Sequence, residues 1–595
     1  MTLSGAAYVV KFLREQGVEV VFGYPGGSIL EIFDAMAADG IRFVLTRHEQ
    51  GAVFAADGYA RATGKVGVCM ATSGPGATNL ITGLACAHMD SVPIVAITGQ
   101  VYSHLLGTDA FQEADTFGIT MPVTKHNFLV RGAGELPSVL RQAFHIAGTG
   151  RRGPVLVDIP RDAAQGVVRS EKADLDLPGY RPTEEGHPLQ LRRAAEALVG
   201  AHKPVIWAGG GVVAAGAAAE LRALAEALGA PVMTSLMGLG VMPADHPLNL
   251  GMVGMHGTPW ANWAVHRCDL LFAAGVRFDD RATGKLERFA PDAQLVHIDI
   301  DPAEIGKLLK AVVPVVADLG TALPAVRALV VQILNGNQRL IGRSGTGPAA
   351  DAGTTAGAEP GAASEAAAAA DHSRKEWLAS IAAFRAGSRW PPITHAGPGM
   401  HPGEVMLALA RASEGKATLV ADVGQNQMWA AQLYPVHAPR RFLTSGGLGT
   451  MGYALPAAIG AQMGTPDEQI IVIAGDGGLQ MTSPELATIA EHRLPIKIFL
   501  INNGHLGMVR QWQELFFKER YMAVKIAGPD FVKLAGAYGL TGMRVDSVKD
   551  LDATIASALS TPGPVLVDCV VQPTANVFPI VPPGKGVDQM IDKAE

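Results

Sequence analysis

The sequence predicts a large α/β protein built from three successive blocks, the first and last of which share one fold. Of its 595 residues 70 are glycine, 48% are hydrophobic and only 17% are charged, as is typical of many tight turns between buried strands and helices. The segment GPVLVD occurs at 153–158 and again at 563–568. This short repeat predicts two like domains at the two ends of the chain.

The middle block is also expected to be α/β. It begins with the strand-like run KPVIWA at 203–208, followed by three glycines, and ends with LVHIDID at 295–301. Both runs are predicted to be strands that lead into loops. Residues 336–372 are rich in Gly, Ala, Thr, Ser and Pro and can bury little surface, so we expect a flexible linker with at most a helical turn or two at 365–370.

Composition excludes several classes of protein. The net charge of −7 disfavours a nucleic-acid partner, and the four scattered cysteines lack the spacing of metal ligands. No apolar run of about 18 residues is present, so no membrane span is expected. The N-terminus leads directly into an amphipathic helix, so we expect no signal or transit peptide and a soluble, cytoplasmic protein.

The strongest functional motif is the turn Gly475-Asp476-Gly477-Gly478 after the apolar run 471–474. A second apolar run, 496–501, ends at Asn502 and Asn503. One carboxylate and one amide oxygen suit Mg²⁺, which completes its coordination with phosphate oxygens and water. The pattern therefore predicts a Mg²⁺-diphosphate site, whereas the GDGG turn alone could be no more than a turn.

This pairing resembles the thiamine diphosphate motif, and that cofactor needs a carboxyl group at its pyrimidine ring. The candidate is Glu49, which follows a predicted strand at 42–45 and begins a helix that runs to Ala62. The alternative is a glutamate favoured at a helix start by the helix dipole.

Further motifs give a closer resemblance. They are FGYPGGSILEIFDA, RHEQGAVFAADGYARATG, ATSGPGATN, DAFQE, RFDDRATGKLERFAP, GDGGLQM and NNGHLGMVRQWQELF. Together they are similar to the catalytic large subunits of the acetolactate synthase (acetohydroxyacid synthase) family over nearly the whole chain outside 336–372. RFDDR and GMVRQWQ distinguish this family from other thiamine diphosphate enzymes.

The resemblance implies three doubly wound domains with mainly parallel sheets. Expected are a pyrimidine-binding domain at 1–170, an FAD-binding domain at 188–335, a flexible linker at 336–374 and a diphosphate- and Mg²⁺-binding domain at 375–595. The family's active site lies between two subunits, which implies a homodimer or homotetramer, and a small regulatory subunit is a possible partner.

The resemblance also assigns the cofactor ligands. Metal ligands would be Asp476, Asn503 and the backbone of His505. Thiamine diphosphate would contact Glu49, Pro75, Asn79, Gln112, Val423, Gln425, Asn426, Gly449, Met451, Gly475, Gly477, Gly478 and Met508. The family commonly has His where this chain has Asn426, and we expect the Asn side chain to donate a hydrogen bond to phosphate instead. Gly449 and Met451 could alternatively serve only strand–helix packing.

Substrate contacts are implied for Gly27, Phe111, Gln112 and Lys125. Arg281 resembles the residue that receives the second substrate's carboxylate, since guanidinium and carboxylate pair well; its alternative partner is Asp279 or Asp280. Met508 and Trp512 share a helix face and would form the pocket wall, or else belong to the core.

FAD contacts are implied along the middle domain. They are Ser91, Arg151, Gly209, Gly210, Gly211, Leu236, Met237, Met255, His256, Gly275, Arg277, Asp279, Asp299 and Ile300. The glycine turn at 209–211 is weak evidence by itself, and RFDDR is the stronger indication.

The implied reaction decarboxylates pyruvate on thiamine diphosphate and joins the hydroxyethyl unit to pyruvate or 2-oxobutyrate, in branched-chain amino acid biosynthesis. The alternatives are another thiamine diphosphate enzyme, such as pyruvate oxidase, glyoxylate carboligase or a 2-oxo acid decarboxylase, and a non-catalytic nucleotide-binding scaffold. Glu49 argues against the carboligase, and Arg281 with Trp512 against the decarboxylase. Retention of Glu49, Asp476 and Asn503 argues against the scaffold.

Overall fold

The computed structural model describes all residues except 1–2, 171–174, 176, 337–359, 394–398 and 593–595. The chain forms two compact units. Unit 1 comprises residues 1–181, 393–436 and 440–577, and unit 2 comprises residues 182–392, 437–439 and 578–595. The exact domain boundaries expected from the sequence stay a prediction.

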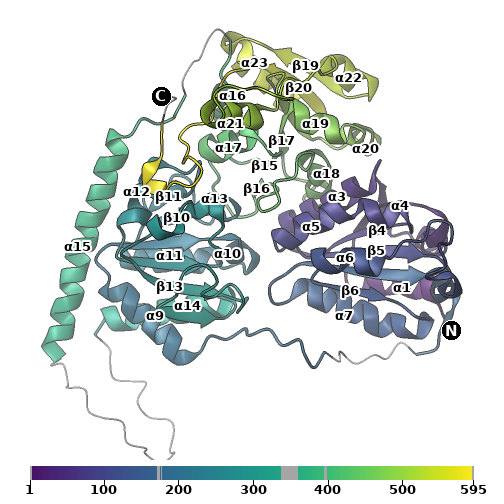
Figure 1. The fold of residues 1–595 in the computed structure, drawn as a ribbon, viewed down its shortest axis with the longest axis horizontal. Helices are drawn as coiled ribbons and strands as arrows, with labels where there is room; N and C mark the ends of the chain where they lie inside the picture. The colour runs from purple at the N-terminus through teal and green to yellow at the C-terminus, as the bar shows by residue number, and fades with distance from the viewer. Residues whose placement is uncertain (1–2, 171–174, 176, 337–359, 394–398, 593–595) are drawn as a thin grey trace, which may run out of the picture. The chain divides into compact units, whose positions relative to one another are not determined.

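Three six-stranded sheets form the framework, and in the described residues all pairings within them are parallel (Figure 1). The central strands of these sheets are buried runs rich in Val, Ile, Leu and Ala, as a parallel sheet covered on both faces requires. The predicted class of three doubly wound α/β domains is confirmed.

The N-terminal sheet of unit 1 has the order β3-β2-β4-β5-β7-β6. Its strands are β2 (Val20–Tyr24), β3 (Arg42–Leu45), β4 (Gly67–Ala71), β5 (Ile94–Gln100), β6 (His126–Leu129) and β7 (Pro154–Pro160). A small antiparallel pair joins β1 (Leu3–Ser4) to β8 (Val167–Val168). The helices are α1 (Gly5–Glu15), α2 (Leu30–Asp39), α3 (Glu49–Thr63), α4 (Pro75–Asn79), α5 (Ile81–Met89), α6 (Thr116–Thr120), α7 (Leu136–Gly148) and α8 (Arg161–Gln165).

The C-terminal sheet of unit 1 has the corresponding order, β16-β15-β17-β18-β20-β19. Its strands are β15 (Thr418–Ala421), β16 (Phe442–Leu443), β17 (Ile470–Gly475), β18 (Lys497–Asn502), β19 (Thr541–Val545) and β20 (Val565–Val570). The helices are α16 (Pro402–Ser413), α17 (Gln425–Leu433), α18 (Ala454–Gly464), α19 (Asp476–Thr482), α20 (Glu485–Glu491), α21 (Gly507–Phe516), α22 (Phe531–Ala537) and α23 (Val548–Ser560). The two GPVLVD segments supply β7 and β20, which hold the same place in the two sheets, so the predicted pair of like domains is confirmed.

Helices α3 and α18 join the two domains of unit 1. One hydrophobic core cluster includes residues of both domains. At the helix crossing, a Cβ on Gly58 would lie 2.0 Å from Ala457 O, and a Cβ on Gly460 would lie 1.7 Å from Ala55 O. Both positions therefore need glycine, because the two backbones touch there.

The sheet of unit 2 has the order β11-β10-β9-β12-β13-β14. Its strands are β9 (Pro204–Ala208), β10 (Val232–Thr234), β11 (Asn249–Met252), β12 (Leu270–Ala274), β13 (Gln294–Asp299) and β14 (Val313–Val316). The helices are α9 (Pro188–Gly200), α10 (Gly210–Ala214), α11 (Ala218–Leu228), α12 (Pro259–Arg267), α13 (Asp280–Thr283), α14 (Leu319–Leu334) and α15 (Pro360–Gly387).

Helix α15 differs from the expected linker (Figure 1). Residues 337–359 lie outside the described part, but the expected turn or two at 365–370 belongs to a helix of 28 residues. Alanine favours the helix, and side chains further along fix it in place. Trp377 stacks on Trp263 of α12 with ring centroids 5.3 Å apart, and buried Arg374 donates to Val199 O at the end of α9 (3.0 Å).

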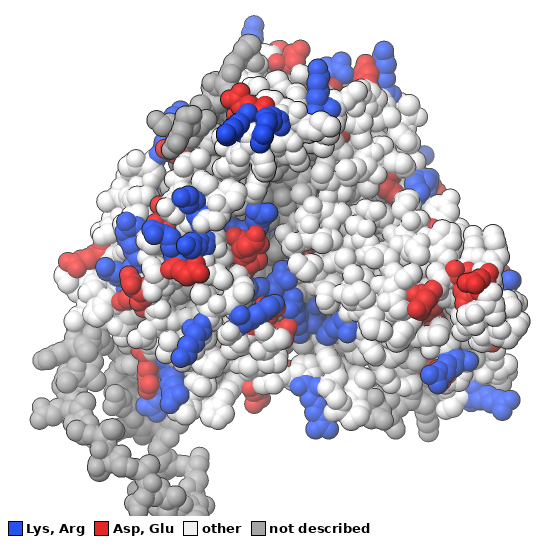
Figure 2. Space-filling view, in the orientation of Figure 1, with Lys and Arg blue, Asp and Glu red and all other residues white. Residues whose placement is uncertain are grey.

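The surface carries few charges. On the face drawn in Figure 2, neutral residues predominate, and basic and acidic side chains are interspersed. Among the described helices, none combines the length and the apolar character that crossing a membrane requires.

Candidate active site

A pocket opens at the carboxyl end of the C-terminal sheet. Its walls follow β15 and β17, the strands between which the chain reverses its order across the sheet, and doubly wound sheets bind ligands at such a point. The lining residues are Val423, Gly424, Gln425, Asn426, Trp429, Met451, Gly475, Asp476, Gly477, Gly478, Ile501, Asn503, His505, Leu506, Gly507, Met508 and Val509. The structure thus brings together most of the predicted diphosphate and metal residues.

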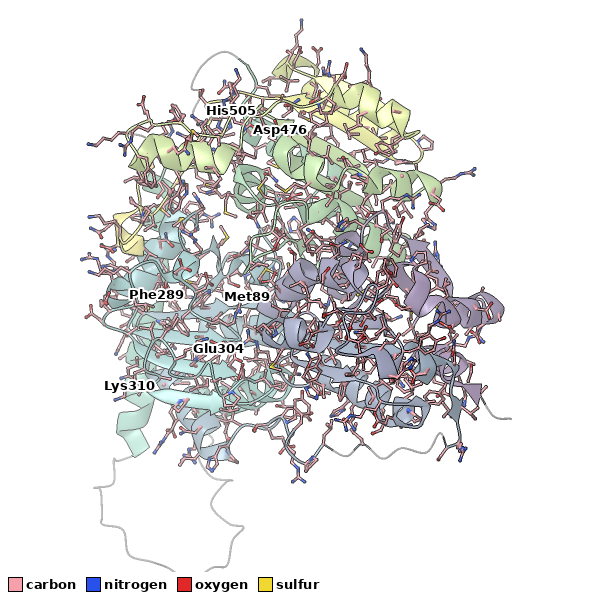
Figure 3. All side chains as sticks on the ribbon, turned by 45° about the vertical axis from the view of Figure 1, so that its right-hand side comes forward. Met89, Phe289, Glu304, Lys310, Asp476 and His505 are labelled. Carbon is pink, nitrogen blue, oxygen red and sulfur yellow. The ribbon has the colours of Figure 1, made fainter. Side chains whose placement is uncertain are left out.

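The three predicted metal ligands all line this pocket, and Figure 3 labels two of them, Asp476 and His505. Asp476 begins α19 and is 3% exposed; its Oδ2 accepts from Gly504 N at 2.8 Å. Asn503 Oδ1 accepts from His505 N at 3.0 Å. Burial raises the pKa of Asp476 to about 6, so its carboxylate sits where a cation would stabilise it.

This donor set fits Mg²⁺. No group of three or more His, Cys, Asp or Glu side chains in the described residues could hold a metal ion. A metal at this pocket would therefore depend on one carboxylate, an amide or backbone oxygen and ligand phosphate, which is the coordination that Mg²⁺ usually takes.

Two glycines of the GDGG turn pack closely against their neighbours. A Cβ on Gly477 would lie 2.7 Å from Leu506 Cδ2, and a Cβ on Gly478 would lie 2.9 Å from the carboxylate carbon of Asp422. Neither position accepts a larger residue without displacement of its neighbours. Gly449 has a φ of +67°, which favours glycine, although it is not among the residues that line the pocket.

The side-chain amide of Asn426, which lines the pocket, donates to two backbone carbonyls. Its Nδ2 donates to Asp422 O (2.7 Å) and to Ile473 O (3.2 Å), and its Oδ1 faces Gly424 and Gly475 at the pocket. In this arrangement the two carbonyls take both amide hydrogens, and the expected donation to phosphate stays a prediction.

Glu49 anchors a second group of predicted residues at the carboxyl end of the N-terminal sheet. It is the first residue of α3, and its Oε2 accepts from Asn79 Nδ2 at 2.9 Å. A Cβ on Gly76, next to Pro75, would lie 3.4 Å from Glu49 Oε1. The helix-start alternative is compatible with this position, because a glutamate in the first turn can serve both purposes.

The predicted substrate residues Phe111 and Gln112 lie near this group. Gln112 has a φ of +58°, and its carbonyl oxygen would lie 2.8 Å from a Cβ on Gly74. The side chain of Phe111 is 87% exposed. A Cβ on Gly27 would meet open space.

Comparison with known proteins decides the family. Three thiamine pyrophosphate enzyme models match the chain: the N-terminal TPP binding domain at 3–119, the central domain at 191–326 and the C-terminal TPP binding domain at 422–569. Acetolactate synthase large subunit IlvB1 of Mycobacterium tuberculosis is 48% identical over 99% of this chain and 91% of that protein. The acetolactate synthase large subunit of Corynebacterium glutamicum is 47% identical (98% and 89%), and the isozyme 2 large subunit of Escherichia coli is 44% identical (99% and 100%).

The chain belongs to the acetolactate synthase large-subunit family. The two like domains of unit 1 are the thiamine diphosphate-binding domains of this family, and the sheet of unit 2 is its central domain. The pocket beside Asp476 lies in the C-terminal domain and Glu49 in the N-terminal one.

Lys125 is placed differently from what resemblance to the acetolactate synthase family implied. Its Nζ donates to Ile146 O (2.5 Å), Thr149 O (2.6 Å) and Tyr180 Oη (2.7 Å). A lysine that joins a helix end to a tyrosine of its own domain holds structure together, so these contacts do not support the expected substrate role.

Arg281, the residue expected to bind the second substrate of an acetolactate synthase, lies on α13 of unit 2. Its side chain is 60% exposed, and its Nε is 3.8 Å from Asp280 Oδ2. Asp279 caps the same helix by accepting from Arg281 N at 3.1 Å. The alternative pairing within the loop is thus present, and Arg281 Nη1 also donates to Met255 Sδ at 3.8 Å.

The FAD candidates of unit 2 occupy loops at the carboxyl ends of its strands. The loops after β9 and β12, between which the strand order reverses, touch: Gly211 N donates to Gly275 O at 3.2 Å. Met237 and Asp299 lie after β10 and at the end of β13. His256 is buried with Nδ1 3.0 Å from Pro579 O, and burial lowers its pKa to about 4. Doubly wound sheets bind ligands at such a reversal of strand order.

Two FAD candidates lie in unit 1 instead. Arg151 Nε donates to Ser91 Oγ at 3.0 Å, and Ser91 has a φ of +58°. The sequence missed several pocket residues: Trp429, Ile501, Leu506, Gly507 and Val509. Each is adjacent to a predicted residue or one helical turn from it, so the strand-end motifs could have indicated them.

Proposed function

We propose that the chain is the catalytic subunit of an acetolactate synthase. It would decarboxylate pyruvate and transfer the two-carbon unit to a second 2-oxo acid, pyruvate or 2-oxobutyrate, in branched-chain amino acid biosynthesis. The observation that carries the proposal is the pocket in which the GDGG turn, the 503–505 turn and α21 meet. The same pocket adjoins both the predicted metal ligands and Met508 of the predicted acceptor helix.

The residues of the chain would divide the work as follows. Asp476, Asn503 and the backbone of His505 would hold Mg²⁺, and the glycine turn would admit the diphosphate. Glu49 would hold a proton at the cofactor's pyrimidine nitrogen and Asn79 would orient Glu49. Bound thiamine diphosphate would supply the electron sink for loss of carbon dioxide.

We propose that the active site is completed by a second copy of the chain. The residues that line the pocket all come from the C-terminal domain, and none of Glu49, Phe111 and Gln112 is among them. The exposure of Phe111 supports an intersubunit role. A homodimer in which the Glu49 group of one protomer faces the Asp476 pocket of its partner would use both groups.

Further cofactor and partner proposals rest on the family. FAD would bind at the strand ends of unit 2, where the loops after β9 and β12 meet. Several relatives are named large subunits, so we propose a small regulatory subunit as a partner. Arg281 would receive the carboxylate of the acceptor.

The test is a product assay with purified protein, pyruvate, thiamine diphosphate, Mg²⁺ and FAD. We expect acetolactate as the main product, and 2-aceto-2-hydroxybutyrate when 2-oxobutyrate is added. Acetaldehyde as the main product would indicate a decarboxylase, and hydrogen peroxide an oxidase. Either result would contradict the proposal.

A further inference from the structure

A pair of buried glutamines joins the pocket to α21. Gln425 is the first residue of α17 and lines the pocket, whereas Gln511 lies in the middle of α21. They are 3% and 0% exposed, and Gln425 Nε2 donates to Gln511 Oε1 at 2.8 Å. Buried side-chain amides are costly unless they are bonded, so this pair links two elements at a fixed distance.

The pair is also fastened to the chain segment after β20. Gln511 Oε1 accepts from Val577 N (2.8 Å), and its Nε2 donates to Val577 O (2.9 Å). Gln425 Nε2 donates its second hydrogen to Ala575 O at 2.9 Å. The side chain of Gln511 thus makes three hydrogen bonds, and these fix the rotation of α21 about its axis.

One atom of the pair lacks a partner. Gln425 Oε1 is buried, and no described group donates a hydrogen bond to it. It would lie 2.1 Å from a Cβ on Gly507, and Asn503 Nδ2 would lie 2.8 Å from the same Cβ. The unpaired acceptor of Gln425 and the donor of Asn503 therefore flank a single point at the start of α21.

Asn503 needs such an acceptor if it binds a metal. A ligating amide presents its oxygen to the ion, and a partner for its NH₂ group fixes that orientation. Asn503 Oδ1 already accepts from His505 N on one side, which leaves Nδ2 on the side of Gln425. A small rotation would bring Nδ2 into hydrogen-bond distance of Gln425 Oε1.

We propose that Gln425 and Gln511 are positioning residues that connect the metal-binding turn to α21. This proposal rests on the proposed function. Gln425 Oε1 accepts from Asn503 Nδ2 when Mg²⁺ and diphosphate are bound, and Gln425 Nε2 holds Gln511. Occupation of the pocket thereby orders the helix that presents Met508 and Trp512, before any acceptor arrives.

Hydrogen exchange with calorimetry tests this connection. On addition of Mg²⁺ and thiamine diphosphate to the full-length wild type, we expect amide exchange in residues 507–516 to slow by about tenfold or more. In Gln425→Met, which keeps the side-chain volume, the Mg²⁺ concentration for half-maximal cofactor binding should rise about 10- to 100-fold. Even at saturating Mg²⁺, Gln425→Met should not show the slower amide exchange of residues 507–516 that is expected for the wild type.

Gln511→Met separates the two halves of the proposal. It should bind Mg²⁺ and thiamine diphosphate with an affinity within about threefold of wild type, yet lose the protection of residues 507–516. The double variant Gln425→Met/Gln511→Met should lose no more of this protection than either single variant. The matched control is Gln462→Met on α18. Gln462 is a buried glutamine whose bonds within the described residues go to carbonyls of Thr465, Pro466 and Glu468, so the wild-type protection should remain.

The outcomes distinguish this proposal from the function on which it rests. Wild-type protein that binds cofactor without protection of 507–516 would overturn the connection alone. Wild-type protection of residues 507–516 from amide exchange in either Gln425→Met or Gln511→Met would also overturn the connection alone. Failure of the wild type to bind Mg²⁺ and thiamine diphosphate at all would overturn the proposed function as well.

Discussion

At the scale of single residues, the proposed role of Glu49 can be tested most directly. Glu49 is the first residue of α3, and its carboxyl group accepts a hydrogen bond from Asn79. The substitution Glu49→Gln keeps the size and this hydrogen bond of the side chain. The amide cannot hold a titratable proton at the pyrimidine nitrogen. We expect a folded protein with an unchanged melting temperature and at least about 100-fold lower acetolactate formation.

Near-normal turnover in a well-folded Glu49→Gln protein would remove Glu49 from the site. Glu31→Gln is the control, because Glu31 lies on α2 of the same domain and pairs with Arg161 at 2.8 Å. It should change activity little if the loss is specific to Glu49.

Asp158 makes stability depend on pH. It is 1% exposed and accepts from Thr98 Oγ1 (2.6 Å) and Gln100 Nε2 (2.9 Å), and burial raises its pKa from 3.8 to about 7. The folded state therefore binds this proton more tightly than the unfolded state. Its contribution to stability is fully present below about pH 4 and is lost as the pH rises through about 7, a change of up to about 4 kcal/mol.

Asp158→Asn should remove this dependence, because the amide is neutral and can still bond to Thr98. Melting temperatures at about pH 5 and pH 8 measure it: the variant should exceed wild type at pH 8 and gain least at pH 5. Asp568 holds the same place in β20 but pairs with Arg544 at 3.0 Å, so Asp568→Asn should destabilise. A variant Asp158→Asn less stable than wild type at pH 8 would contradict this account.

The sequence predicted which residues lie at the site better than it predicted the hydrogen-bond partners of their side chains. The GDGG turn, Asn503 and Glu49 follow strands, and strand ends converge at one edge of a parallel sheet, so their position could be foreseen. The contacts of Asn426 and Lys125 could not be foreseen, because each side chain binds at least one carbonyl from a segment more than 20 residues away in sequence. Motif resemblance carries no information about such partners.

Among the elements, α15 shows how an anchor far along the chain orders a low-complexity stretch. Composition at 363–370 predicted little structure, yet Arg374, Trp377 and Ile381 are buried in unit 2. Arg374 is the last residue of the linker expected at 336–374, and Trp377 and Ile381 follow it. Alanine then extends the anchored helix at little cost.

Trp377→Ala should therefore destabilise unit 2. The side chain is 4% exposed, stacks on Trp263 and donates to Pro204 O at 3.3 Å, so its loss should cost about 3–5 kcal/mol. Differential scanning calorimetry should show a lower melting temperature. A separate binding measurement should show weaker FAD retention. Lys375→Ala on the exposed face of the same helix should change stability by less than about 0.5 kcal/mol. Equal melting temperatures in both variants would mean that α15 is not held through Trp377.

Helix α21 presents the predicted acceptor wall. Met508 and Trp512 are half-buried, whereas the buried residues of this helix are Arg510 and Gln511. The interpretation of Met508 and Trp512 as core residues is thus disfavoured. Trp512 instead packs edge-on against Phe516 with ring centroids 5.4 Å apart.

Trp512→Leu should keep pyruvate decarboxylation and flatten the preference between acceptors. One extra methylene against an aromatic wall is worth about 1 kcal/mol, so the preference for 2-oxobutyrate should fall several-fold. A competition assay with both 2-oxo acids reads the ratio of the two products. An unchanged ratio in an active Trp512→Leu enzyme would leave acceptor choice to other residues.

At the scale of the whole molecule, a six-residue repeat predicted the architecture. GPVLVD fills β7 and β20, and the two sheets around these strands have the same strand order. The repeat could not reveal that α3 and α18 cross on Gly58 and Gly460, because close approach of two helices leaves no pattern beyond one glycine in each. Nor could it reveal that residues 578–595 belong to unit 2.

The central claim is an acetolactate synthase site that combines the Glu49 group of one copy with the Asp476 pocket of another. Complementation between Glu49→Gln and Asp476→Asn tests it most directly. Each variant alone should form almost no acetolactate. After co-expression or dissociation and reassociation, half of the dimers are mixed and each has one intact site, so about a quarter of wild-type activity should return. No recovery in a mixture shown to contain mixed dimers would contradict the shared site, because it would place Glu49 and Asp476 of a single chain in each active centre.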